Sequence, residues 1–143
     1  MIRPMLTKDI DAVVAIEIES FSIPWSKDAF EDEMKNSKAY YVVMEEDNII
    51  IGYGGFWKIF EEGHFTNLAI TPAYRKKGLA KKLIEAMLNY CRTLDIQNAT
   101  LEVRESNISA LKAYSALGFC VEGKRRRYYT NPVEDALIMW LSL

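Results

Sequence analysis

The chain has 143 residues, half of them hydrophobic, and its 18 basic and 20 acidic residues leave a formal net charge of −2. This length and apolar content exclude intrinsic disorder and predict one domain, residues 1–143, with a core of its own. The charge gives no general electrostatic case for nucleic acid, and no apolar run approaches the roughly 20 residues of a membrane span. A single His excludes a His-rich zinc site, so we expect no bound metal.

The N-terminus and the cysteines predict a cytoplasmic location. Residues 1–4 begin directly with structured sequence and show no features of a signal peptide. Cys91 and Cys120 both sit inside apolar patterns. This placement predicts two small core residues in a reducing compartment, not a disulfide or a metal pair.

Hydrophobic periodicity predicts alternating strands and helices along the chain. A short strand at residues 2–5 precedes a helix over about residues 7–18, and Ser26 is the expected N-cap of a second helix that ends near residue 36. Trp25 and Phe30 flank that cap at the spacing of a hydrophobic staple. The remaining elements are, in chain order, strands at 39–44, 49–60 and 64–70, a helix after 78, a strand at 99–104, a helix at 107–117, and strands at 119–123 and 136–141.

The order of these elements predicts an α/β fold with a mixed sheet. The strand–helix–strand unit at 64–104 implies a central parallel strand pair with a right-handed crossover, whereas the early strands are joined by hairpins. The sheet is therefore expected to be mostly antiparallel and flanked by helices. Gly52, Gly54 and Gly55 predict a bulge or a close backbone approach within the strand at 49–60.

The segment Arg75-Lys76-Lys77-Gly78-Leu79-Ala80 follows an apolar strand and opens a long helical pattern. The N–H groups in the first turn of a helix lack intrahelical partners and carry the positive end of the helix dipole. Gly78 lets a ligand approach the backbone closely, and Ala80 adds little bulk. The segment matches neither known phosphate loop, but it predicts a backbone cradle for phosphate groups. The alternative is a helix that merely starts with Lys-Lys-Gly.

A second group of polar residues lies on the strand at 99–104 and the helix after it. Leu101 and Val103 share one face of this strand, which leaves Glu102 and Arg104 on the other. A central parallel strand is expected to be nearly all apolar, so Glu102 is an anomaly beside the phosphate turn. The alternative is a solvated face, or an ion pair between Glu102 and Arg104 or a lysine. Asn107 either caps the next helix or bonds an amide of a ligand.

Together these segments resemble one family. Arg-x-x-Gly-x-Ala after a strand is typical of the GNAT superfamily of acetyl-CoA-dependent N-acetyltransferases. The segments at 101–107 (Leu-Glu-Val-Arg-x-Ser-Asn), 114–119 (Tyr-x-x-Leu-Gly-Phe) and 24–26 (Pro-Trp-Ser) are similar to those of its RimI-type members. Those members acetylate the N-terminal alanine of small-subunit ribosomal protein eighteen. The resemblance covers residue 2 to about residue 140, and Ala80 stands where many relatives carry a second glycine.

The resemblance implies the GNAT fold, acetyl-CoA as cosubstrate, and roles for individual residues. Glu102 is implied as the general base and Tyr114 as the general acid, and Asn107 is implied to hold the pantetheine or the region near the thioester. Backbone groups of the preceding strand are implied to bond the pantetheine arm, at Leu68, Ala69 and Ile70. Backbone groups of the phosphate turn are implied to hold the pyrophosphate, at Lys76, Lys77, Gly78, Leu79, Ala80 and Lys81.

A different set of residues is implied to bind the peptide that accepts the acetyl group. The basic and aromatic run at 124–129 is by itself interpreted as a solvated loop, with RNA binding as a less favoured alternative. In the family this hairpin overhangs the peptide entrance, which implies Tyr128 and Tyr129 as walls of the substrate channel. Trp25 belongs to the motif that favours a peptide substrate, and Glu134 and Asp135 are candidates for attracting a basic peptide.

The chemistry of the amine bears on the choice of substrate. An amine must be neutral to attack a thioester, which at pH 7 costs roughly 1–1.4 kcal/mol for an α-amine and roughly 4.6 kcal/mol for a lysine. A modest base such as Glu102, directly or through a water molecule, therefore suits a peptide N-terminus. A phenol is a weaker acid than a thiol, so Tyr114 is expected mainly to donate a hydrogen bond to the departing sulfur.

Three functions remain in view. The first is an N-terminal acetyltransferase acting on the N-terminus of a ribosomal protein, as a monomer or weak dimer without nucleic acid or membrane. The second is a GNAT enzyme for a small amine or for protein lysines. The third is a module that senses acyl-CoA without turnover. The set of Glu102, Asn107 and Tyr114 argues against the third function, and the resemblance favours the first.

Overall fold

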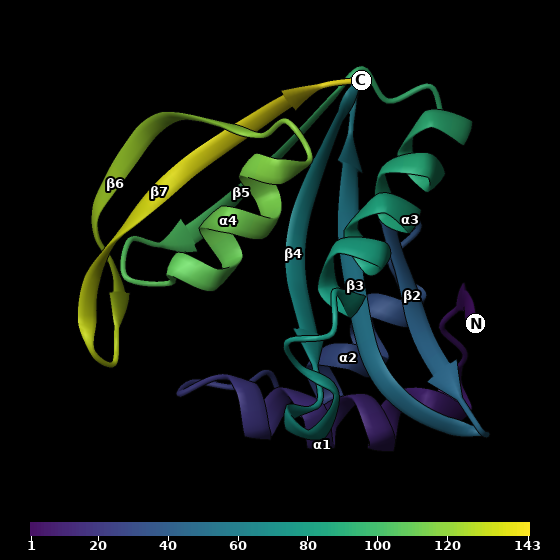
Figure 1. Ribbon diagram of the computed structural model, residues 1–143. Helices are drawn as coiled ribbons and strands as arrows, with labels where there is room; N and C mark the ends of the chain where they lie inside the picture. The colour runs from purple at the N-terminus through teal and green to yellow at the C-terminus, as the bar shows by residue number, and fades with distance from the viewer.

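The structure, a computed structural model, describes residues 1–143 (Figure 1). Seven strands form one sheet in the order β1-β2-β3-β4-β5-β7-β6, and all neighbours are antiparallel except β4 and β5, which are parallel. The strands are β1 (Ile2–Pro4), β2 (Ala39–Glu46), β3 (Ile49–Ile59), β4 (Glu62–Ile70), β5 (Asn98–Arg104), β6 (Cys120–Thr130) and β7 (Val133–Ser142). The predicted mixed sheet with a central parallel pair is confirmed.

Helices cover both faces of this sheet. The helices are α1 (Ile10–Ser20), α2 (Lys27–Lys35), α3 (Leu79–Thr93) and α4 (Ile108–Ala116), with short 3₁₀ turns η1 (Thr7–Asp9) and η2 (Pro72–Tyr74). The helices α3 and α4 lie on one face, and α1 and α2 lie on the other (Figure 1). None of them combines the length and the apolar character that a bilayer span requires.

The predicted start of α2 is confirmed in detail. The Ser26 hydroxyl accepts a hydrogen bond from the Ala29 N–H at 3.1 Å. The Trp25 ring packs against Phe30 with ring centroids 5.6 Å apart. This staple fixes the loop between α1 and α2, because Phe30 is fully buried in the core beneath it.

The glycines of β3 are needed for space. A Cβ atom at Gly55 would lie 2.1 Å from the Tyr41 ring, and one at Gly54 would lie 2.5 Å from the Met87 sulfur. The two side chains approach β3 from opposite faces of the sheet, since Tyr41 packs with the α1 side and Met87 with the α3 side. The pairing of β3 with β2 skips Ile51, beside Gly52, so the predicted bulge and the close approach both occur. The pairing of β3 with β4 skips Thr66, which makes a second bulge, in β4.

Two predictions about the C-terminal region are wrong. The basic run at 124–129 lies in β6 and is not a loop, because β7 pairs with it as far as the hairpin and acidic side chains face its cations. Lys124 Nζ lies 3.2 Å from a Glu105 carboxylate oxygen. Cys120 is exposed because it opens the edge strand β6, whereas Cys91 is buried as predicted.

The strands β4 and β5 separate after a short contact. Their pairing is confined to residues 62–64 of β4 and 98–100 of β5. Beyond these residues the two strands diverge, so the sheet is open at its centre toward the carboxyl ends of both strands (Figure 1). Open α/β sheets bind ligands at this end of their strands.

Candidate active site

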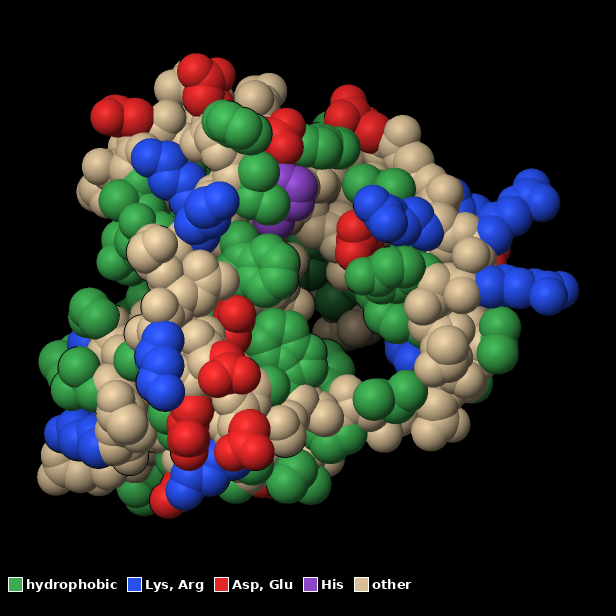
Figure 2. Space-filling model, turned by 180° about the vertical axis from the view of Figure 1, so that it is seen from behind, with side chains coloured by type: hydrophobic (Ala, Val, Ile, Leu, Met, Phe, Trp, Pro, Cys, Tyr) green, Lys and Arg blue, Asp and Glu red, His purple; other side chains and the backbone are tan.

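The opening between β4 and β5 holds a cavity of about 780 Å³. Its walls come from both faces of the sheet: the end of α1 and the loop after it, β4, β5, α4, and the β6–β7 hairpin. Figure 2 shows this face of the molecule as a hollow between two bodies, with hydrophobic side chains on its walls. We call this cavity the cleft.

The turn before α3 presents free backbone donors. Lys76 and Gly78 have positive φ angles of 64° and 75°, and α3 then begins at Leu79 with no side-chain cap. As a result, the N–H groups of residues 76–81 have no hydrogen-bond acceptor within the chain. A Cβ atom at Gly78 would meet no atom within 4 Å, so the approach to these donors is open. Six unpaired N–H groups at a helix N-terminus suit a pyrophosphate.

Arg75 holds this turn in place. Its Nε atom donates to the Ile70 carbonyl oxygen at 2.8 Å, and its guanidinium also donates to the Ser20 hydroxyl at 3.0 Å. The arginine of the motif therefore ties the turn to the end of β4 and to the end of α1. Its role in this structure is to shape the cradle.

The edge of β4 that faces β5 is unpaired over its second half. Leu68, Ala69 and Ile70 pair with β3 on one side, but the partner strand on the other side has already diverged. Their backbone groups on that side can pair with the amides of an extended ligand, as in strand addition to a sheet edge. Leu68 also lines the cleft.

Glu102 lies on the opposite face of β5 from the core. Leu101 and Val103 pack into the core with α3 and α4, and Glu102 lines the cleft with a side chain about 30% exposed. An ion pair exists, but its partner is Arg125, whose Nε lies 3.4 Å from a Glu102 oxygen. Arg104 instead pairs with Glu134. Glu102 is therefore paired with a cation and also exposed to the cleft.

Tyr114 approaches the cleft from the α4 face. Its ring packs against Phe119 at a centroid distance of 5.4 Å, and the residue is 8% exposed. Burial raises the pKa of its hydroxyl well above the ordinary value near 10. The raised pKa makes Tyr114 a poor proton donor but keeps it a hydrogen-bond donor, as the sequence-based expectation required.

Asn107 caps α4 and also lines the cleft. Its side-chain oxygen accepts the Ala110 N–H at 3.1 Å, so the capping alternative is correct. Its side-chain NH₂ group donates to no atom of the chain, and Asn107 is part of the cleft wall. Capping therefore leaves this group available to a ligand.

The residues predicted to form the walls of the peptide channel lie in one cavity. Trp25, Tyr128 and Tyr129 all line the cleft. The pKa of the Tyr128 hydroxyl is raised, first of all by its interaction with the Glu102 carboxylate. Burial raises the pKa of Tyr129 to about 12. The hydroxyls of Tyr128 and Tyr129 both interact with the Glu102 carboxylate, and Tyr129 also interacts with Tyr114.

Glu134 and Asp135, by contrast, do not line the cleft. Asp135 accepts the Arg127 N–H at 2.9 Å, inside the β6–β7 hairpin. Glu134 accepts the Ser106 N–H at 2.6 Å, and hydrogen bonding to Ser106, first through its side chain, holds the Glu134 pKa below the usual range. Both carboxylates are engaged in fixing local backbone, so the structure does not bring them to the cavity as candidates for attracting a peptide.

Glu17 and Asn67 are polar residues of the cleft wall that were not among those predicted from the sequence, and His64 also lines the cleft. Glu17 is 1% exposed, and it lies four residues after the buried Val13 on the apolar face of α1. A carboxylate at a core position of an amphipathic helix is a signal that the pattern contained. Asn67 carried no such signal, because its partner Glu17 lies 50 residues away in the chain.

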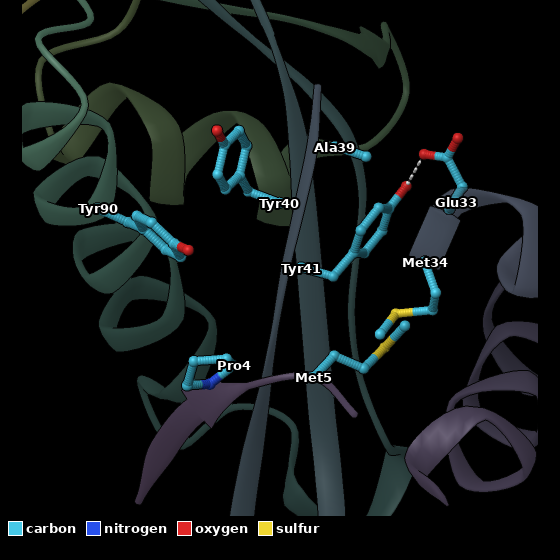
Figure 3. Close-up of a pocket in the computed structure, with 8 residues that line it drawn as sticks. All are labelled: Pro4, Met5, Glu33, Met34, Ala39, Tyr40, Tyr41 and Tyr90. Carbon is cyan, nitrogen blue, oxygen red and sulfur yellow. Dashed lines mark hydrogen bonds between the residues drawn. The ribbon is translucent and has the colours of Figure 1, made fainter. Parts of the chain in front are cut away.

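A second cavity, of about 150 Å³, lies at the edge of β2 and is not a candidate for chemistry. Tyr40 and Tyr90 lie on one side of β2 there, and Tyr41 and Glu33 lie on the other (Figure 3). The Glu33 carboxylate already accepts hydrogen bonds from Tyr41 at 2.8 Å and from the Trp57 indole at 2.6 Å. Nor does the chain bring three or more His, Cys, Asp or Glu side chains together as a metal site.

Comparisons with known proteins agree with this geometry. Residues 10–119 match the model of the acetyltransferase (GNAT) family. A Bacillus subtilis relative is 41% identical over 143 residues, covering 99% of this chain and 95% of its own. The ribosomal protein bS18-alanine N-acetyltransferase of Haemophilus ducreyi is 35% identical, with both chains covered completely. The crystal structure of the ribosomal-protein-S18-alanine N-acetyltransferase from Escherichia coli has a TM-score of 0.92 and 28% identity, covering 99% of this chain and 92% of that one.

Proposed function

The chain belongs to the GNAT acetyltransferase family, and we propose from this premise that it transfers an acetyl group from acetyl-CoA to the N-terminal alanine of ribosomal protein bS18. The observation that carries the proposal is the cleft. Free backbone donors lie at one end of the β4–β5 opening, and a carboxylate beside aromatic walls lies on the other face. The full-length likeness to bS18-alanine N-acetyltransferases supports the choice of acceptor. We further propose that the activity is cytoplasmic, because this substrate is a ribosomal protein.

The cosubstrate fits the α3 side of the opening. The N–H groups of residues 76–81 are suited to hold the pyrophosphate, and the free edge of β4 at residues 68–70 is suited to bond the pantetheine amides. The NH₂ group of Asn107 lies along the same path on the cleft wall. Acetyl-CoA supplies the activated thioester, and these residues bind and orient it.

Residues on both faces of β5 then serve the transfer. Glu102 accepts the proton that the α-ammonium group loses, directly or through water, and the neutral nitrogen attacks the thioester carbon. Backbone N–H groups of β4 are suited to stabilise the developing oxyanion. As the C–S bond breaks, Tyr114 donates a hydrogen bond to the departing sulfur from the opposite side, and the second proton lost by the nitrogen passes through solvent to the CoA thiolate. Trp25, Tyr128 and Tyr129 guide the peptide toward Glu102.

A turnover panel tests the proposal. The purified protein is given acetyl-CoA with an Ala-Arg-starting peptide, with the same peptide blocked at its N-terminus but containing lysine, and with spermidine. We expect rapid CoA release with the first peptide only, and mass spectrometry should locate the acetyl group on its α-amine. Faster turnover of spermidine or of the blocked peptide would move the assignment to a small-amine or lysine acetyltransferase.

A further inference from the structure

A carboxylate is buried at the wall of the cleft without a cationic partner. Glu17, near the end of α1, accepts hydrogen bonds from the Trp25 N–H at 2.8 Å, from the Tyr53 hydroxyl, and from the Asn67 NH₂ group at 3.2 Å. No lysine or arginine pairs with it, although the residue is 1% exposed. Buried charges in proteins are usually paired, so this site is electrostatically incomplete.

Asn67 carries the second sign of incompleteness. It lies at the β4 bulge, is 8% exposed and lines the cleft. Its side-chain oxygen is the one buried side-chain nitrogen or oxygen atom of the chain without a hydrogen-bond partner. The amide cannot simply be reversed, because the Glu17 carboxylate is an acceptor and so requires the NH₂ group to face it. The free oxygen is therefore fixed on the side away from Glu17.

These two features call for the same ligand chemistry. An unsatisfied acceptor needs an N–H or O–H donor, and a buried anion behind it favours a donor that carries positive charge. A primary ammonium group meets both requirements. Asn67 contacts the α1 side of β4, and Glu102 lies on the corresponding face of β5, so both face the side from which we expect the peptide.

We propose that the Asn67 side-chain oxygen, oriented by Glu17, binds the α-ammonium group of the acceptor peptide. This inference rests on the proposed function and names the subsite that recognises the amine. Asn67 takes up no proton: one N–H of the ammonium group gives its proton to Glu102, and a second N–H donates to Asn67. The nitrogen lone pair freed in this way is directed at the thioester carbon.

This arrangement also favours the transition state. The nitrogen gains positive charge as the C–N bond forms, so its hydrogen bond to Asn67 becomes stronger during attack. Glu17 polarises the Asn67 amide through the bond to its NH₂ group, which makes the opposite oxygen a better acceptor. Glu17 is thus a positioning residue, and through the Trp25 N–H it also holds the loop that walls the cleft.

The experiment compares binding of two peptides in the presence of saturating CoA. One peptide starts with alanine, and the other is its desamino analogue, in which a propionyl group replaces the alanine. Calorimetry on the wild type should show the amino peptide binding about 10-fold tighter, the weight of one charge-assisted hydrogen bond. Asn67→Leu, which keeps the size of the side chain, should abolish this preference.

Tyr53→Phe is the matched control. It removes a different donor from the same Glu17 carboxylate. The Tyr53 hydroxyl also neighbours the Asn67 side chain, but its loss leaves the Asn67 NH₂ group bonded to Glu17 and the Asn67 oxygen in place. We expect Tyr53→Phe to lower the melting temperature and keep the preference for the amino peptide. Glu17→Gln keeps the shape of the side chain but removes its charge, so it should reduce the preference for the amino peptide. This second variant provides the test if Asn67→Leu does not fold. An unchanged KM for acetyl-CoA shows that each variant retains its cleft.

The outcomes separate the two proposals. Equal affinity of the wild type for both peptides, or an undiminished preference in both Asn67→Leu and Glu17→Gln, overturns the ammonium subsite. If the wild type prefers the amino peptide and the variants lose that preference, the subsite stands even if no acetyl group is transferred. Turnover of the alanine peptide without any such preference leaves the proposed function intact and refutes the subsite.

Discussion

The two sides of the cleft are built from different kinds of groups. The α3 side consists of backbone donors on contiguous residues, the turn at 76–81 and the free edge of β4. The acceptor side consists of side chains that come from α1, β4, β5 and β6, such as Glu17, Glu102 and Tyr128. The first side therefore depends on local backbone conformation. The second depends on single side chains that strand register and packing bring together.

The largest effect is expected on the acceptor side. Glu102→Gln keeps the shape of the side chain and removes its basic oxygen, so kcat should fall about 10²–10⁴-fold while the KM for acetyl-CoA barely changes. Glu105→Gln is the control, since Glu105 is the next acidic residue and pairs with Lys124 outside the cleft. If Glu102→Gln keeps full activity and the wild-type pH profile, Glu102 is only the ion-pair partner of Arg125.

The α3 side should respond to backbone conformation. Gly78→Val places a β-branched residue at a φ of 75° and a side chain over the open cradle, so the KM for acetyl-CoA should rise about 10-fold or more. Gly118→Val imposes similar strain at a φ of 102°, at the end of α4. We expect it to lower stability without this change in KM. A folded Gly78→Val protein with unchanged KM contradicts the phosphate assignment.

Tyr114 should matter less than Glu102. Tyr114→Phe removes one hydrogen bond to the departing sulfur, so kcat should fall about 10-fold. Because burial raises the pKa of this hydroxyl, its donor proton is present below that pKa and is lost only as the pH rises through it. The wild-type pH–rate profile should thus show no Tyr114-dependent decline up to about pH 10. A decline near pH 9 that Tyr114→Phe abolishes contradicts this.

The smallest effect is expected at Arg125, at the exposed edge of the cleft. Arg125 faces Glu102 at 3.4 Å but is about 57% exposed, and exposed ion pairs contribute little. Arg125→Met should change kcat/KM by about threefold or less. Lys124→Met, whose partners are Glu105 and Asp135, removes the neighbouring charge without touching Glu102. A loss in Arg125→Met that approaches the loss in Glu102→Gln would make Arg125 part of the catalytic machinery.

The same difference explains what the sequence could predict. The mixed sheet, the cap at Ser26 and the turn at Gly78 follow from residues close together in the chain, and the structure contains all three. Glu102 was recognised because an acidic residue interrupts an apolar strand. The family resemblance, and not the pattern, supplied roles for Tyr114 and the two tyrosines of the hairpin.

Other features of the site could not be predicted because they depend on distant pairing. Asn67 meets Glu17 across 50 residues of sequence, a contact that requires α1 to pack against the face of β4 that Asn67 shares with Ala69. Arg125 reaches Glu102 because β6 extends along β7 well beyond its apolar start. Asp135 has a charge that suits a peptide site, but the hairpin engages it in a backbone hydrogen bond.

A crystal structure with a bisubstrate analogue, CoA joined through an acetyl bridge to the nitrogen of an alanine-starting peptide, tests the central claim most directly. We expect pyrophosphate oxygens about 3 Å from the N–H groups of residues 76–81, and pantetheine along the free edge of β4. The bridged nitrogen should lie in the β4–β5 opening between Asn67 and Glu102, with the peptide beneath Tyr128 and Tyr129. A nitrogen bound away from Glu102, or a phosphate arm outside the turn at 76–81, would refute this mode of binding.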